Sequence, residues 1–81
     1  IHNIVSEKSG EGFHIIIIGN PEHPEVVGIK GWAKDNVTVI QSAEDAECFT
    51  ADRKEKICIV SQTTFNYNKF KDLVEIIMKK S

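Results

Sequence analysis

The chain has 81 residues, of which 41% are hydrophobic and 27% charged, a composition that argues against disorder and low complexity. Ten basic and twelve acidic residues give a formal net charge of −2, and no basic stretch indicates a nucleic-acid partner or a membrane surface. The apolar run from Ile15 to Ile18 is far shorter than the roughly 20 residues that cross a bilayer. Two cysteines without CxxC spacing and no secretory signal favour a reduced, cytoplasmic setting over a disulfide framework.

Residues 1–9 have the spacing of an amphipathic helix, with Ile1, Ile4 and Val5 as apolar positions and a Ser-Gly-Glu-Gly turn after them. No capping residue precedes this helix, although its free N–H groups need one. We therefore expect residues 1–81 to be a single α/β domain taken from a longer chain. The sequence shows no internal repeat and no linker that would divide it further.

Three short apolar runs predict strands, and the segments between and after them predict helices. The strands are Phe13–Ile18, Val37–Ile40 and Lys56–Val60. The helices are Glu25–Trp32, with Pro24 in its first turn, and Ala43–Phe49, with Ser42 as its cap and Asp45 in capping-box position. Asn66 opens a longer helix with one apolar face, formed by Tyr67, Phe70, Leu73, Val74, Ile77 and Met78.

The order of these elements predicts the fold class. The first and third strands are apolar nearly throughout, as strands are when helices cover both faces of a parallel sheet. Strands and helices alternate along the chain, and right-handed crossovers favour neighbours on both sides of the first strand. We expect a small three-layer α/β sandwich with a mainly parallel sheet in the order 2-1-3.

Two loops are candidates for chemistry, because ligands of parallel sheets meet the loops at the carboxyl ends of the strands. The loop after the first strand carries His23 and Glu25, an imidazole and a carboxylate at the start of a helix. The loop after the third strand, Ser61-Gln62-Thr63-Thr64, offers three hydroxyls and an amide. In the order 2-1-3 the two strands are neighbours, so we expect these loops to face one another.

The residues of these two loops also allow purely structural interpretations, without a role in chemistry. The His-Pro-Glu segment is also a common helix start, and the Ser/Thr cluster a common capping segment. His14 is expected to be a satisfied sheet histidine, and residues 52–56 a solvated connection. Cys48 and Cys58 behave most simply as small core residues, and they form no recognised zinc spacing with a histidine. Walker A, GxGxxG and GxSxG motifs are absent from the sequence.

The sequence resembles one enzyme family along essentially its whole length. Ile17-Ile18-Gly19 leads into His23-Pro24-Glu25-Val26, followed by Gly28 and Gly31-Trp32, and Ser61-Gln62-Thr63-Thr64 matches a family motif that usually reads Thr-Gln-Thr-Thr. These motifs, in this order and spacing, resemble the central domain of 4-hydroxy-3-methylbut-2-enyl diphosphate reductase. That oxidoreductase is the iron–sulfur enzyme that ends the non-mevalonate pathway of isoprenoid biosynthesis. The replacement of Thr by Ser61 keeps a hydroxyl.

The resemblance implies a function for each candidate residue. The family removes the hydroxyl of a small diphosphate substrate with two electrons and two protons, giving isopentenyl and dimethylallyl diphosphates. By position, Glu25 matches the proton donor, His23 a substrate-binding histidine and Thr63 a residue that binds substrate and relays protons. Gln62 matches a supporting residue at most.

The resemblance also implies a cofactor, partners and a setting. Family members hold an oxygen-sensitive 4Fe–4S cluster through three cysteines, which we expect outside residues 1–81, so Cys48 and Cys58 are not ligands and this piece binds no metal and is inactive alone. Expected partners are the flanking domains and a ferredoxin-type or flavodoxin-type electron donor, in a bacterial cytoplasm, with no nucleic acid and no membrane. The chief alternative is a non-catalytic α/β scaffold or interaction module, and a weaker one is an oxyanion-binding domain of another enzyme.

Overall fold

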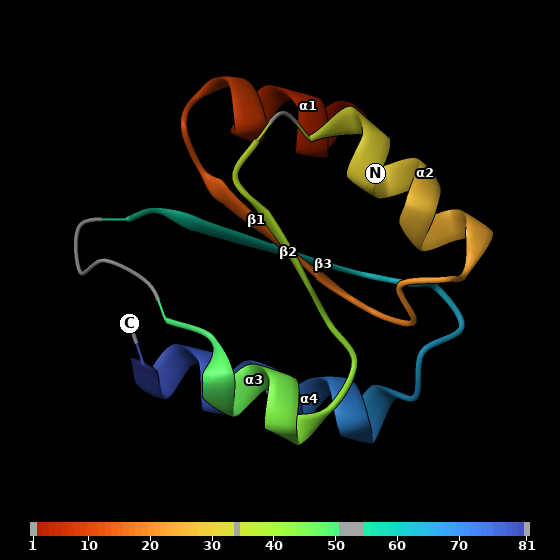
Figure 1. The fold of residues 1–81 in the computed structure, drawn as a ribbon, viewed down its shortest axis with the longest axis vertical. Helices are drawn as coiled ribbons and strands as arrows, with labels where there is room; N and C mark the ends of the chain where they lie inside the picture. Colours follow the sequence, from red (N-terminus) through yellow and green to blue (C-terminus); the bar gives the residue numbers. More distant parts are fainter. Residues whose placement is uncertain (1, 34, 51–54, 81) are drawn as a thin grey trace.

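The structure of the chain is a computed structural model that describes residues 2–33, 35–50 and 55–80. Four helices and three strands alternate along these residues (Figure 1). Their bounds are α1 His2–Gly10, β1 His14–Ile18, α2 Pro24–Trp32, β2 Val37–Ile40, α3 Ala43–Cys48, β3 Ile57–Ser61 and α4 Tyr67–Lys80. Most of the predicted solvated connection, residues 52–54, lies outside the described residues.

The three strands form one parallel sheet in the order β2-β1-β3, which confirms the predicted topology. Ile15 of β1 lies opposite Val37 of β2 on one side and Cys58 of β3 on the other. Because all three strands run in the same direction, their carboxyl ends meet at one edge of the sheet. The loops after β1 and β3 leave the sheet at this edge.

The central strand β1 divides the core into two layers. Successive side chains of a strand point to opposite faces, so Ile15 and Ile17 face one helix layer while Ile16 and Ile18 face the other. Helices α1 and α2 cover the first face, and α3 and α4 cover the second (Figure 1). All five residues of β1 are buried, as its nearly continuous apolar sequence predicts, and His14 is the one polar residue among them.

The third strand differs from the prediction in two ways. It begins and ends one residue later than predicted, so Ser61 pairs with Ile18 inside the sheet rather than standing in the loop. The five residues of β3 are also only half-buried, because β3 is an edge strand with a neighbour on one side alone. An apolar sequence therefore predicted more coverage for this strand than the fold supplies.

The helices begin and end close to the predicted residues. Asn66 caps α4 by accepting a hydrogen bond from Lys69 N–H at 2.9 Å, and Ser42 caps α3 by accepting one from Asp45 N–H at 3.2 Å. Asp45 differs from a standard capping box, because its carboxylate accepts from Gln41 N–H, one residue before the cap.

The apolar faces of the helices are narrower than their sequences suggest. On α4, Leu73 and Ile77 are buried, whereas Tyr67 and Met78 are 72% and 59% exposed. On α1, Val5 is buried but Ile4 is exposed. Among the described residues, no helix has the length and apolarity that spanning a membrane requires.

Candidate functional site

The loop after β1 is an ordered turn that leads directly into α2. The side-chain oxygen of Asn20 accepts a hydrogen bond from Glu22 N–H at 2.9 Å, and its backbone carbonyl accepts one from His23 N–H at 3.0 Å. Asx turns of this kind fix the backbone two residues ahead of the asparagine. The turn therefore places His23 at the position where α2 begins.

His23 is the N-cap of α2. Its ring Nδ1 accepts a hydrogen bond from Glu25 N–H at 3.1 Å, and Pro24 occupies the first turn with its fixed φ. Because Nδ1 accepts from a backbone N–H, the neutral ring carries its proton on Nε2. The half-buried imidazole therefore presents a donor, and no described residue accepts from it. The helix-cap interpretation of this residue is correct, and it leaves Nε2 available to a ligand.

Glu25 and Thr63 meet directly, although 38 residues separate them in sequence. Both the backbone N–H and the hydroxyl of Thr63 donate to Glu25 Oε1, at 2.9 and 3.1 Å. Both bonds end on Oε1, and no hydrogen bond from a described residue reaches Oε2. No described hydrogen bond or ion pair joins the His23 ring to this carboxylate, so the imidazole shares the edge of the sheet but contacts Glu25 only through the backbone.

Gln62 is buried between the two loops, with 9% of its surface exposed. Its side-chain oxygen accepts from Asn20 N–H at 3.0 Å, and its Nε2 donates to Thr64 Oγ1 at 2.8 Å. Gly19 lies beneath this side chain, and a Cβ there would stand 2.8 Å from Gln62 Cβ and Oε1 and 2.9 Å from Val26 Cγ2. The glycine that ends β1 is therefore required for the close approach of Gln62.

A pocket of about 310 Å³ adjoins Thr63 on the side of α4. One wall is polar and consists of Ser61, Gln62 and Thr63, and the other is aromatic and consists of Phe65, Tyr67 and Phe70. Thr63 belongs to this pocket and also contacts Glu25. Tyr67 and Phe70 were predicted on the apolar face of the last helix, and nothing in the sequence indicated that they line a pocket with Phe65.

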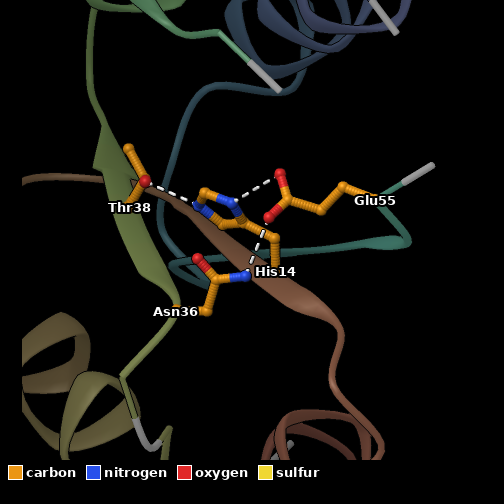
Figure 2. Close-up of polar contacts among 4 residues, drawn as sticks. All are labelled: His14, Asn36, Thr38 and Glu55. Carbon is orange, nitrogen blue, oxygen red and sulfur yellow. Dashed lines mark hydrogen bonds and ion pairs between the residues drawn. The ribbon is translucent and has the colours of Figure 1, made fainter. Parts of the chain in front are cut away.

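A second polar cluster lies at the opposite edge of the sheet, where the strands begin (Figure 2). His14 Nε2 bonds Thr38 Oγ1 at 2.7 Å, and Asn36 Nδ2 donates to Glu55 Oε2 at 2.9 Å. His14 Nδ1 lies 3.2 Å from Glu55 Oε1, at the distance of an ion pair but without the alignment of a hydrogen bond. The ring also packs edge-on against Phe49.

This cluster revises two predictions. The prediction that residues 52–56 are a solvated connection is wrong for Glu55, whose side chain is only 22% exposed. The prediction of a satisfied histidine is confirmed at Nε2, which bonds Thr38, and is wrong at Nδ1, which is buried without a hydrogen bond among the described residues. His14 of β1 contacts Thr38 of β2, and Glu55, which precedes β3, contacts Asn36, which precedes β2. These contacts join the starting ends of all three strands.

The two cysteines lie apart. Cys48 is exposed on α3, so the expectation that it is a core residue is wrong, whereas Cys58 packs on the other face of the sheet, against the core beneath α1 and α2. Within the described ranges no group of three or more His, Cys, Asp or Glu side chains is placed to hold a metal ion. The described residues therefore do not form a site for an iron–sulfur cluster.

Comparison with known proteins identifies the family. The family model described as LytB protein matches residues 1–81. The chain is 39% identical over 85 residues to 4-hydroxy-3-methylbut-2-enyl diphosphate reductase of Clostridioides difficile, covering 96% of this chain and 30% of that enzyme. It is 38% identical over 81 residues to the reductase of Caldanaerobacter subterraneus subsp. tengcongensis, covering 100% of this chain and 27% of that enzyme.

A solved structure shows the same similarity in three dimensions. The chain superposes on E-1-hydroxy-2-methyl-but-2-enyl-4-diphosphate reductase from Plasmodium falciparum with a TM-score of 0.91 and 26% identity, covering 98% of this chain and 25% of that one. The chain thus spans between a quarter and a third of the length of these relatives. Because the family model covers every residue and the fold agrees, the chain belongs to the LytB protein family, whose curated relatives are 4-hydroxy-3-methylbut-2-enyl diphosphate reductases.

Proposed function

We propose that residues 1–81 are the central domain of a 4-hydroxy-3-methylbut-2-enyl diphosphate reductase and supply one wall of its active site. The observation that carries this proposal is the pair of hydrogen bonds from Thr63 to Glu25 Oε1, at 2.9 and 3.1 Å, across 38 residues of sequence. They join a carboxylate and a hydroxyl from two separate crossovers at the carboxyl edge of the sheet, where parallel sheets bind ligands. This convergence supports the enzyme hypothesis over a scaffold module.

In this proposal Glu25 donates the proton and Thr63 relays it. Reductive removal of an allylic hydroxyl consumes two electrons and two protons and releases water, so the site must deliver protons at the hydroxyl. Oε1 of Glu25 is held by Thr63, while Oε2 faces no described donor and is free to exchange a proton. A positioned carboxyl group of this kind contributes about 10²–10⁴-fold through general acid catalysis.

The neighbouring groups bind the substrate. His23 presents Nε2–H, which suits a phosphate oxygen of the diphosphate. Thr63 also lines the pocket of about 310 Å³, whose aromatic wall fits the branched hydrocarbon part of the same molecule. Gln62 supports the two loops through its hydrogen bonds to Asn20 and Thr64.

The remaining parts of the reaction come from outside the described residues. No described residues form a metal site, so the 4Fe–4S cluster and its cysteine ligands belong in this proposal to other parts of the reductase. A ferredoxin-type or flavodoxin-type protein supplies the electrons, and the flanking domains supply the other walls of the site. This domain contributes orientation and protons, and the proposed setting is the bacterial cytoplasm.

The role of Glu25 is tested with Glu25→Gln in the full-length reductase. The amide keeps the size of the side chain and an oxygen that accepts from Thr63, but it cannot donate the carboxyl proton. We expect kcat to fall by about hundredfold or more while substrate affinity stays within about threefold. The matched control is Glu22→Gln, because Glu22 is an exposed carboxylate in the same loop. A kcat close to that of the unmodified enzyme would contradict the proposed role.

The location of the cluster is tested with the 81-residue chain itself. After anaerobic reconstitution with iron and sulfide, we expect no iron–sulfur absorbance from this chain, because Cys48 and Cys58 lie on different faces of the sheet. The full-length reductase treated in the same way serves as the positive control. A stoichiometric cluster on the short chain would show that its own residues form the site.

A further inference from the structure

Gln62 is buried in a loop whose next two residues are exposed. It keeps 9% of its surface accessible, while Thr63 and Thr64 face solvent. Burying an amide is costly unless both ends are hydrogen-bonded. Here both ends are bonded, the oxygen to Asn20 N–H and the nitrogen to Thr64 Oγ1. The side chain is therefore held in one orientation.

The contact with Asn20 fixes the direction of the amide. A backbone N–H only donates, so the atom of Gln62 that faces Asn20 is its carbonyl oxygen, and Nε2 must face Thr64. This bond spans 42 residues and ties the first residue of the turn after Gly19 to the end of β3. From Asn20 the turn leads to the cap at His23 and then to Glu25.

Gly19 leaves the space that this arrangement needs. A side chain at that position would collide with Gln62 and with Val26 of α2 at distances below 3.0 Å. Because Gly19 has no side chain, Gln62 lies directly across the backbone that connects β1 to the turn. The two loops are thus linked twice, once by Gln62 and once by the bonds from Thr63 to Glu25.

We propose that Gln62 is a positioning residue for Glu25, which acts by clamping the loop after β1 to the loop after β3. The proposal rests on the proposed function, because it assumes that the Glu25 carboxyl is the proton donor. Thr63, the residue beside Gln62, supplies both donors to Oε1 of that carboxylate. When the clamp is removed, the loop that carries Asn20 can shift relative to Thr63, and the carboxyl group loses its fixed place. Misplacement of a reacting group by about 1 Å can cost about a hundredfold in rate.

The test compares Gln62→Met with Gln41→Met in the full-length reductase. Methionine keeps the length of the side chain but makes neither hydrogen bond, and Gln41 is an exposed glutamine that follows β2 at the same edge of the sheet. We expect Gln62→Met to lower kcat about tenfold with KM changed less than about threefold, and Gln41→Met to change neither. Amide exchange at Asn20 should accelerate only in the Gln62 variant.

A double-mutant cycle with Glu25→Gln shows whether Gln62 acts through Glu25. If it does, adding Gln62→Met to Glu25→Gln lowers the residual kcat by less than about twofold, because the group being positioned is already absent. Multiplicative losses would overturn the proposal, and so would a Gln62→Met enzyme with unchanged kcat. If Gln62→Met does not fold, Thr64→Val takes its place, since it removes only the partner of Nε2. We expect Thr64→Val to lower kcat about two- to threefold, again only when Glu25 is present.

Failure of this inference is distinguishable from failure of the proposed function. The unmodified full-length protein is assayed first with 4-hydroxy-3-methylbut-2-enyl diphosphate. Absence of turnover there, with the cluster in place, refutes the proposed function. Normal turnover combined with a Gln62→Met enzyme that behaves like Gln41→Met refutes only the positioning role.

Discussion

The two edges of the sheet carry polar clusters of different character. At the edge where the strands begin, His14 is 8% exposed and its partners lie on or beside the strands. At the edge where they end, Glu25 and Thr63 lie on a helix start and a loop, and atoms such as Glu25 Oε2 and His23 Nε2 meet no described partner. Groups whose bonds are used within the protein stabilise it, whereas groups with spare donors and acceptors can act on a ligand.

The difference follows from where each cluster sits on the backbone. A buried polar side chain on a strand depends on groups inside the protein, as His14 depends on Thr38 at Nε2 and on Glu55, 3.2 Å away, at Nδ1. Side chains after the strands face outward and are held by turns and caps, such as the one that Asn20 builds for His23. We therefore expect changes to polar side chains to alter stability at the first edge and turnover at the second. His14→Leu and Thr63→Val test this division, and Gly19→Ala and Gly28→Ala test the packing around two glycines.

Gly19→Ala is expected to have the largest effect, because it disturbs packing and site together. The added Cβ would lie 2.8 Å from Gln62 Cβ and Oε1 and 2.9 Å from Val26 Cγ2, and Cβ atoms cannot swing away as side-chain ends do. Overpacking of this kind costs about 3 kcal/mol at the upper end of its range. Urea unfolding measures the loss, with Gly31→Ala as a control, since a Cβ at Gly31 meets nothing within 4 Å. An unchanged free energy of unfolding would contradict the tight fit at Gly19.

His14→Leu removes the polar contacts at the edge where the strands begin and leaves those at the other edge unchanged. The change removes the bond to Thr38 and the contact with Phe49 and leaves Glu55 without its ring partner. Loss of one partner in a buried polar pair costs about 1–3 kcal/mol. We expect the free energy of unfolding to fall by about 2 kcal/mol while kcat of the full-length folded enzyme is unchanged. A loss of turnover without a loss of stability would reverse the proposed division between the edges.

The contact at the edge where the strands end could be predicted from the sequence, whereas the cluster at the edge where they begin could not. The meeting of Glu25 and Thr63 follows from the strand order, which alternating elements and apolar strands already indicate. The first cluster was not predictable in the same way. Glu55 stands among charged residues and reads as solvent-exposed, and only the pairing of β1 with β3 brings it to His14.

The burial of Gln62 could not be predicted from the sequence, for a different reason. A glutamine among hydroxyl residues looks like part of a polar loop, and its burial depends on the empty space at Gly19, a contact 43 residues away in sequence. The glycine after β1 was the available signal, because a glycine at a strand end often marks close approach of another part of the chain. Neither residue alone indicates which side chain fills that space.

Thr63→Val tests the role of the threonine hydroxyl at the edge where the strands end. Valine keeps the shape of threonine and the backbone N–H that donates to Glu25 at 2.9 Å, so only the hydroxyl bond at 3.1 Å is lost. Because Thr63 is exposed, we expect the free energy of unfolding to fall by no more than about 0.5 kcal/mol. In the full-length reductase we expect kcat to fall about tenfold, and Thr63→Ser to retain most of it. Equal kcat values for the two variants would show that the hydroxyl does not act in the reaction.

Gly28→Ala should have the smallest effect on the enzyme, because it leaves turnover unchanged and shifts stability slightly in the opposite direction. Gly28 lies in the middle of α2, is exposed, and a Cβ there meets nothing within 4 Å. Glycine in a helix interior costs about 0.5–1 kcal/mol relative to alanine, because it gives the unfolded chain more freedom. We expect the free energy of unfolding to rise by about that amount without a change in kcat. The same substitution is thus expected to stabilise the helix at Gly28 and to disrupt the clamp at Gly19, nine residues earlier, because only Gly19 has another side chain packed against its backbone.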